Sequence, residues 1–150
     1  MKIQGVSPIL NVTDVPASVL WFERLGWSRG FAWNDGGMIA CAALENEHGP
    51  ARFAGICANG PEEGAGPMLF LCQDGQGARD PRPVRDARHD DFGAVWMSWW
   101  VADVDAAHRE CLAAEVEILR PPVNEPWGVR EFLVRHPDGH CFRISGPVTA

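Results

Sequence analysis

The chain has 150 residues, and a domain of this size buries roughly 70% of its unfolded surface, so it needs neither a disulfide nor a metal ion to fold. Its hydrophobic fraction of 46% and charged fraction of 22% are ordinary for a globular protein and exclude collagen-like and wholly disordered classes. The net charge of −7 argues against nonspecific binding of DNA or RNA, which depends on Lys and Arg, and favours neutral or cationic ligands.

The first half of the chain predicts one helix between strands. Asp14 can cap this helix, Pro16 is tolerated in its first turn, and Gly26 ends it. The Asn-Asp-Gly-Gly sequence at residues 34–37 predicts the turn of a hairpin. We interpret this half as the order β-α-β-β-β, with strands expected at residues 3–12, 27–33, 38–44, 53–58 and 68–72, one more than that order requires.

The second half repeats that order after a stretch with little to bury. Residues 73–93 are dense in charge, Pro and Gly, and we interpret them as a connecting loop. Asp103 can cap a helix that runs to about Ala114. The strands expected here are residues 95–101, a short one at 116–119 before Pro121 and Pro122, 129–135 and 140–145. Residues 1–150 therefore form one domain, with modules at about 1–72 and 94–146.

The repeat is visible in the letters as well as in the elements. Residues 12–17 (VTDVPA) match residues 101–106 (VADVDA), and Asp103 lies 89 positions after Asp14. In each copy the Asp falls where a strand passes into a helix, so its carboxylate can accept hydrogen bonds from the first turn. A chance match of one hexapeptide is the alternative, and the repeated order of elements argues against it.

The Trp and Cys content bears on function and location. Seven Trp and no Tyr indicate either a heavily aromatic core or a cavity lined with indole rings. The five Cys are an odd number without a C-x-x-C pair, as expected for reduced thiols. No apolar run approaches the roughly 20 residues that cross a bilayer, and the N-terminus lacks the regions of a signal peptide. We expect a cytoplasmic protein with no membrane or nucleic-acid partner.

Two sequence pieces point to a family. Residues 127–132 (WGVREF) run into residues 136–140 (HPDGH). With the two β-α-β-β-β copies and the V-x-D-V junctions, they resemble the vicinal oxygen chelate superfamily of glyoxalases, extradiol dioxygenases and bleomycin-resistance proteins. The resemblance covers nearly all of the chain except the central loop. It implies an α+β fold in which each module curls into an open half-barrel, a ligand in the hollow, and a homodimer.

The same resemblance implies where a metal would bind. Metal-using members have a His on the first strand of a module, seven residues before the junction Asp, and a Glu on the last strand. The corresponding residues here are Ser7, Trp96, Arg143 and either Phe70 or Cys72. A guanidinium does not coordinate a divalent cation, and the five His lack the spacing of ligands on one element, which favours surface or turn positions. We expect no metal, no cofactor and no catalytic residue, and lean toward a protein that is not an enzyme.

The hollow is then expected to be aromatic with one cation. If Trp96 faces inward, alternation puts Ser98 and Trp100 on its face and Trp99 on the other. Arg143 also faces inward, where it pairs with a ligand anion or with an internal acid such as Glu131. The candidate ligand-binding residues are Ser7, Trp33, Phe70, Trp96, Ser98, Trp100, Trp127, Phe132 and Arg143. The alternative for the Trp rings is that they fill the core or a dimer interface.

Three functions follow from these patterns. The leading one is a metal-free binder that resembles bleomycin-resistance proteins and sequesters an aromatic or cationic drug-like compound. One alternative is a metal-dependent lyase or isomerase of the glyoxalase or dioxygenase type with displaced ligands. The other is a structural or partner-binding module whose hollow is closed by Trp side chains.

Overall fold

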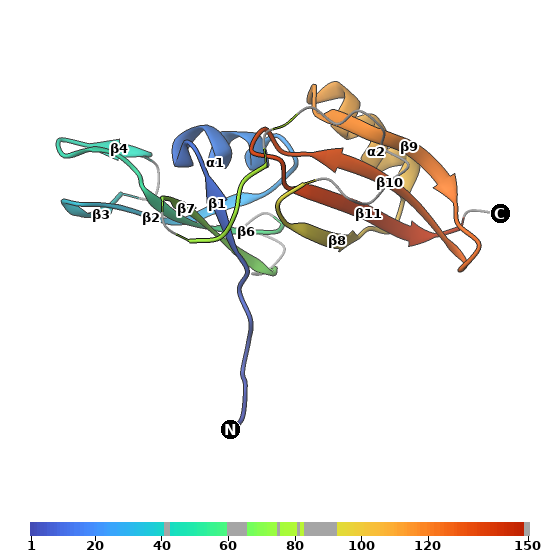
Figure 1. The fold of residues 1–150 in the computed structure, drawn as a ribbon, viewed down its shortest axis with the longest axis horizontal. Helices are drawn as coiled ribbons and strands as arrows, with labels where there is room; N and C mark the ends of the chain where they lie inside the picture. The colour runs from blue at the N-terminus through green and yellow to red at the C-terminus, as the bar shows by residue number, and fades with distance from the viewer. Residues whose placement is uncertain (41–42, 60–65, 75, 81, 83–92, 149–150) are drawn as a thin grey trace. The chain divides into compact units, whose positions relative to one another are not determined.

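The protein is described by a computed structural model that covers residues 1–40, 43–59, 66–74, 76–80, 82 and 93–148 (Figure 1). It consists of two compact units, Met1–Ala78 and Arg79–Ala150. Each unit is an open sheet with one helix against one of its faces, which confirms the predicted α+β class. Of the helices described, α1 has 9 residues and α2 has 10, and neither has the length or apolar character to cross a membrane.

The first unit is built on a five-stranded sheet with the order β1-β7-β6-β2-β3. Strand β1 runs parallel to β7, and the other neighbours are antiparallel. A separate two-stranded hairpin pairs β4 with β5. The elements are β1 (Ile9–Val12), α1 (Val15–Glu23), β2 (Ser28–Asn34), β3 (Gly37–Ile39), β4 (Glu45–Asn46), β5 (Gly49–Pro50), β6 (Phe53–Cys57) and β7 (Met68–Gln73).

Two predictions for this unit were wrong. The first strand begins at Ile9 instead of residue 3, because Pro8 lacks the N–H that would continue the ladder, although its carbonyl still accepts from Phe70 at 2.9 Å. Strand β3 ends at Ile39, and the β4–β5 hairpin follows. The Asn34 side chain orders this hairpin by donating to Asn46 at 2.7 Å and to the Gly49 carbonyl at 2.8 Å.

The second unit is built on a four-stranded sheet with the order β8-β11-β10-β9, in which β8 is parallel to β11. Its elements are β8 (Trp96–Trp100), α2 (Val104–Ala113), β9 (Glu117–Asn124), β10 (Val129–Arg135) and β11 (Cys141–Pro147). Strand β9 continues through Pro121 and Pro122, where the sequence predicted an end. The prolines are tolerated because β9 is an edge strand whose register with β10 shifts between Glu131 and Leu133.

Both junction aspartates cap their helices, as predicted. The Asp14 carboxylate accepts from the Ala17 N–H at 2.9 Å, and the Asp103 carboxylate accepts from the Ala106 N–H at 2.8 Å. After α1, Gly26 adopts a φ of +82°, the left-handed conformation typical of a helix stop. The repeated motif therefore sets the start of each helix.

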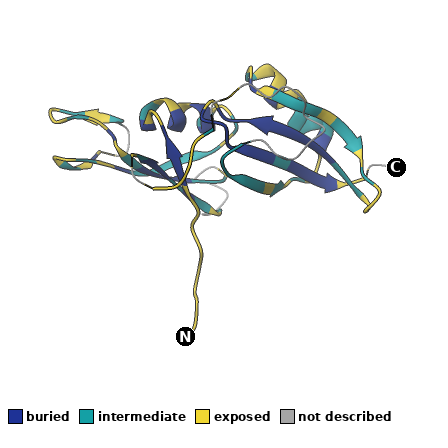
Figure 2. Cartoon of the chain, in the orientation of Figure 1, coloured by how far each residue is buried: buried dark blue, intermediate teal, exposed yellow. Residues whose placement is uncertain are grey.

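The core of each unit lies between its sheet and its helix. In the first unit the buried strand residues include Leu10, Ile56 and Leu71, and the buried helix residues include Val19 and Phe22. In the second unit β10 and β11 carry most of the buried residues, drawn in dark blue in Figure 2. Because strand side chains alternate, the other face of each sheet carries a second set of side chains.

The start of the second unit is bonded to the turn between β10 and β11. The buried Arg135 side chain donates to the backbone carbonyls of Asp80, at 3.0 Å, and of Arg82. The Asp80 N–H donates to the Asp138 carbonyl at 2.9 Å. Gly139, at a φ of +89°, is required here because a Cβ would lie 1.8 Å from the Asp80 carbonyl oxygen.

Replacing Asp103 by Ala should lower the free energy of unfolding by about 1 kcal/mol, because the first turn of α2 loses its side-chain acceptor. Urea unfolding followed by circular dichroism measures the change. Asp103→Asn is the control, since its carbonyl oxygen can still accept, and it should retain most of the stability. Equal losses in the two variants would contradict the capping role.

Candidate ligand-binding site

The face of the second sheet opposite α2 carries the indole rings expected there. The parallel register pairs Trp96 with Cys141, Ser98 with Arg143, and Trp100 with Ser145, and such partners point to the same side. Trp99 points to the other side, where its ring stacks on Phe142 with centroids 4.3 Å apart. We call the side with Trp96, Ser98, Trp100 and Arg143 the open face of the second unit.

The most exposed indoles of this unit are those of Trp100 and Trp127. Trp100, at the end of β8, is 72% exposed, and Trp127, in the turn between β9 and β10, is 65% exposed. Trp96 is half-buried and Ser98 is exposed. Trp100 and Trp127 therefore do not fill the core of this unit. For these two rings, the core is excluded as an alternative to a place in the ligand site.

Phe132 does not belong to this face, so its assignment to the ligand site was wrong. It is 0% exposed and makes an edge contact with His108 of α2, with ring centroids 5.2 Å apart. Its register partner is Ile144, which is buried as well. Strand alternation explains the error, because the neighbouring Glu131 occupies the open face instead.

A buried carboxylate organises the polar part of the open face. Glu131 is 1% exposed, and its Oε1 atom lies 2.9 Å from Nη2 of Arg120 and 3.4 Å from Nε of Arg143. Its Oε2 atom accepts from the Ser145 hydroxyl at 3.2 Å. Arg120 also forms an ion pair with Glu125 at 2.8 Å. Arg143 was expected to pair with a ligand anion or with an internal acid, and the structure contains the pair with the internal acid Glu131.

Arg143 also lies against an indole ring. Its Cζ atom is 5.7 Å from the centroid of the Trp96 ring, within the range of a cation–π contact. Its side chain is 34% exposed, although its Nε atom is buried. The open face thus presents a cation beside an indole ring, with the Ser98 hydroxyl on the adjacent strand.

The open face of the first unit is also aromatic. Phe31, Phe53 and Phe70 form one cluster, with ring centroids between 5.4 and 6.1 Å apart. The Phe31 ring covers Gly55, where a Cβ would lie 2.4 Å from Cε1 of Phe31. Trp33 pairs in register with Phe53 and is partly exposed.

Two members of this cluster were missed by the sequence analysis. Phe31 lies two residues before Trp33 on β2, so strand alternation from Trp33 could have found it. Phe53 could have been found only through its register with Trp33, which depends on pairing between distant segments. Ser7 lies in the exposed segment before β1 and joins neither open face.

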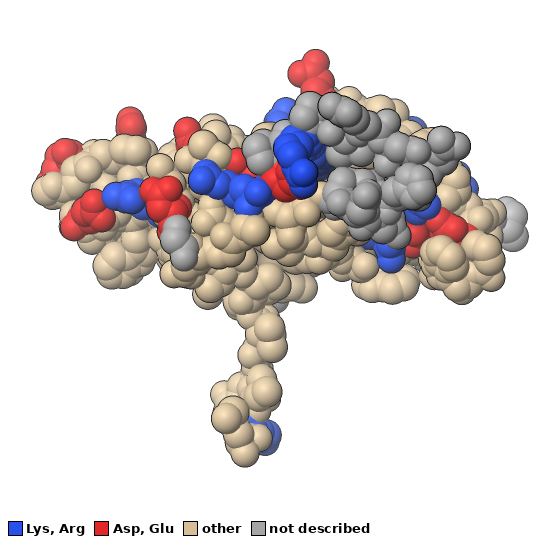
Figure 3. Space-filling view, in the orientation of Figure 1, with Lys and Arg blue, Asp and Glu red and all other residues tan. Residues whose placement is uncertain are grey.

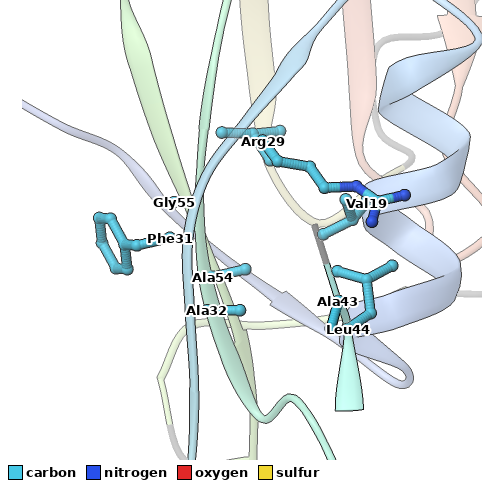
Figure 4. Close-up of a pocket in the computed structure, with 9 residues that line it drawn as sticks. Val19, Arg29, Phe31, Ala32, Ala43, Leu44, Ala54 and Gly55 are labelled. Atoms are coloured by element: carbon cyan, nitrogen blue, oxygen red, sulfur yellow. The ribbon is translucent and has the colours of Figure 1, made fainter. Parts of the chain in front are cut away.

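A small pocket opens on the other side of the first sheet, toward α1. It has at most about 190 Å³ of space, open solvent included, and is lined by residues that include Val19, Arg29 and Leu44. Figure 4 shows that Phe31 points away from these side chains, across β2. Ligand pockets usually enclose ~300 to 1,000 Å³, so this pocket is too small for a drug-sized molecule. The open faces are the better candidates.

The described residues include no group of three or more His, Cys, Asp or Glu side chains placed to hold a metal ion. At the positions corresponding to the family's metal ligands, Phe70 belongs to an aromatic cluster and Arg143 pairs with Glu131. His136 and His140 lie in the turn between β10 and β11, one of the two kinds of position expected for the His residues, and both are buried there. His89 lies outside the described residues.

The model of the Glyoxalase/Bleomycin resistance protein/Dioxygenase superfamily matches residues 5–144. No curated protein sequence matches the chain. A glyoxalase-related enzyme from Clostridium phytofermentans is similar in structure, with a TM-score of 0.66, 18% identity, and coverage of 99% of this chain and 98% of that one. TioX from Micromonospora sp. ML1 gives a TM-score of 0.63 and 23% identity over 96% of this chain and 100% of that one.

A third similar structure contains an organic ligand. It is the bleomycin-binding protein from bleomycin-producing Streptomyces verticillus, complexed with copper(II)-bleomycin. The TM-score is 0.57 and the identity 24%, with coverage of 99% of both chains. At such identities the likeness to these structures establishes the fold alone.

The buried turn histidine should make the protein less stable in acid. Burial, together with the nearby His140, lowers the pKa of His136 to about 3, whereas an unfolded chain has a His pKa of about 6.5. Between these values the unfolded state binds the proton and the folded state does not. The free energy of unfolding should therefore fall, by on the order of a few kcal/mol, as the pH drops from about 6.5 to 3.

Urea unfolding at a series of pH values tests this expectation. The His136→Asn variant should lose most of the pH dependence in that window, because it has no imidazole to protonate. His48→Asn, which changes an exposed His, is the matched control and should keep the dependence. An unchanged slope in His136→Asn would contradict the assignment.

Proposed function

This chain belongs to the glyoxalase/bleomycin resistance protein/dioxygenase superfamily, and we propose from that premise that it binds and sequesters a small drug-like organic molecule without a metal ion. The observation that carries the proposal is the aromatic character of both open faces. One presents Phe31, Phe53 and Phe70, and the other presents Trp96 and Trp100.

Exposed rings are costly unless something covers them. Trp100 and Trp127 are 72% and 65% exposed, which is high for the side chain with the largest apolar surface. A planar ligand stacked on such a ring gains on the order of 1 kcal/mol beyond the burial of apolar area. The ligand we propose is therefore aromatic in at least the part that meets these rings.

The net charge of the chain bears on the charge of the ligand. The net charge of −7 gives a general preference for neutral or cationic molecules. On the face seen in Figure 3, basic side chains lie beside acidic ones, with uncharged surface between them. This distribution supports a small-molecule partner over a nucleic acid.

The similar structures support the same class of partner. The Streptomyces verticillus protein is complexed with copper(II)-bleomycin, which is an organic ligand held by this fold. The homodimer and the cytoplasmic location implied by the sequence remain predictions. A second function, as a metal-dependent enzyme, would require metal ligands elsewhere in the chain, because Arg143 and Trp96 occupy positions at which the family's metal ligands lie.

Trp100 should report and strengthen ligand binding. A thermal-shift screen of antibiotics and aromatic metabolites identifies a ligand, since a compound at about 100 times its dissociation constant stabilises by about 2.7 kcal/mol. Titration of that ligand should quench Trp fluorescence, and Trp100→Ala should weaken binding by roughly 1 to 3 kcal/mol.

The matched control for Trp100 is its neighbour on the opposite face. Trp99→Phe keeps an aromatic ring against Phe142, so ligand binding and quenching should persist. Trp100→Phe and Trp96→Phe should each reduce the quenching. Loss of quenching in Trp99→Phe alone would place the ligand on the helix side of β8 and contradict the proposal.

Metal analysis separates the binder from the enzyme alternative. After dialysis the purified protein should carry well under one equivalent of zinc, iron, nickel or manganese, because Trp96 and Arg143 cannot coordinate a divalent cation. Elemental analysis by mass spectrometry measures this. One equivalent that survives dialysis and disappears in His140→Ala would favour the enzyme.

A further inference from the structure

We propose that Arg143 recognises a carboxylate on the ligand, and that the ligand is therefore an aromatic acid at the point where it meets β11. This inference rests on the proposed function and narrows it, because the function alone allows an aromatic or a cationic molecule. It is carried by the way in which the two arginines of the open face share one buried carboxylate.

Glu131 is fully engaged without Arg143. Its Oε1 atom accepts a hydrogen bond from Nη2 of Arg120 at 2.9 Å, and its Oε2 atom accepts from the Ser145 hydroxyl at 3.2 Å. Both carboxylate oxygens therefore have a hydrogen-bond donor from another residue. Nε of Arg143 approaches Oε1 only to 3.4 Å, as an ion pair.

The two arginines differ in how well they are paired. Arg120 contacts two carboxylates, Glu125 at 2.8 Å and Glu131 at 2.9 Å. Arg143 contacts one, at the longer distance, whereas the buried Nε atoms of both arginines lack a hydrogen-bond partner among the described residues. Arg143 is therefore the less completely paired of the two, and its remaining N–H donors can bond to an acceptor supplied by a ligand.

The geometry around Arg143 matches a carboxylate joined to a ring. A planar guanidinium binds a carboxylate through two parallel N–H donors, which a neutral acceptor cannot fully use. Ser98 pairs with Arg143 in the ladder, is exposed, and can donate a further hydrogen bond to the same group. The Trp96 ring, 5.7 Å from the guanidinium carbon, and Trp100 on the same strand face can contact the aromatic part.

A cationic group would be disfavoured at the same position. It would lie close to the Arg143 charge, whereas the acidic neighbours Glu125 and Glu131 are already paired with Arg120. The net charge of −7 therefore attracts cations to the protein in general but not to this part of the open face.

Three probes with one ring system test the inference. These are 2-naphthoate, the neutral 2-naphthamide and the cationic 2-naphthylmethylammonium, titrated into the full chain by calorimetry at fixed ionic strength. We expect 2-naphthoate to bind about tenfold more tightly than the ammonium compound, with the amide between them. Arg143→Gln should abolish this preference, and Arg143→Lys should retain part of it.

The matched control is on the opposite face of the same sheet. Arg130→Gln changes the net charge by the same amount, but Arg130 bonds to Asp105 of α2 at 2.7 and 3.0 Å and does not reach the open face. It should keep the preference for 2-naphthoate. Loss of the preference in Arg130→Gln as well would assign it to overall charge and overturn the proposal.

A second variant should change the affinity for 2-naphthoate in the opposite direction. Glu131→Gln removes the charge that attracts Arg143 while keeping the shape of the side chain, so the affinity for 2-naphthoate should rise. A purely structural ion pair between Arg143 and Glu131 predicts no such gain. The Glu131→Gln measurement tests the inference by itself if Arg143→Gln fails to fold, as judged by circular dichroism.

The outcomes separate the inference from the function on which it rests. If 2-naphthylmethylammonium binds as tightly as 2-naphthoate, or binds alone, the inference is wrong and the proposed function stands. The same holds if folded Arg143→Gln keeps the preference. If none of the probes and none of the screened compounds binds, the proposed function and the inference both fail.

Discussion

The burial of one face of each sheet against a single short helix is the constraint on which the rest of the structure depends. Because side chains alternate along a strand, every residue that packs toward the helix fixes the direction of its neighbours. Leu71 and Ile56 face α1, so Phe70 and Gly55 must face the other way. The aromatic open faces are thus a consequence of core packing as well as of the residues chosen for them.

Local signals in the sequence predicted much of this fold. The two capping aspartates and the strand at residues 129–135 were predicted from chemistry confined to a few neighbouring residues. The errors lie where distant segments decide the outcome. Strand β9 passes through two prolines because it pairs on one side only, and the β4–β5 hairpin depends on the Asn34 side chain.

The candidate site was predictable to a similar extent. Alternation along one strand placed Trp96, Ser98 and Trp100 together, because that argument needs only the direction of a single residue. Alternation could not choose a partner for Arg143, since this requires the register of β10 against β11 and the position of Arg120 on β9. Phe132 was misplaced for the same reason, as its contact with His108 joins two elements.

The hydrogen bonds from Arg135 to the carbonyls of Asp80 and Arg82 determine how the chain can be divided. An isolated second half that started just before β8 would leave this buried guanidinium without those acceptors. The natural point of separation is therefore upstream, between Ala78 and Arg79, although β8, the first strand described in the second unit, begins only at Trp96. A fragment meant for separate expression, or for recombination with a related half, would have to begin before Asp80 so that these acceptors are included.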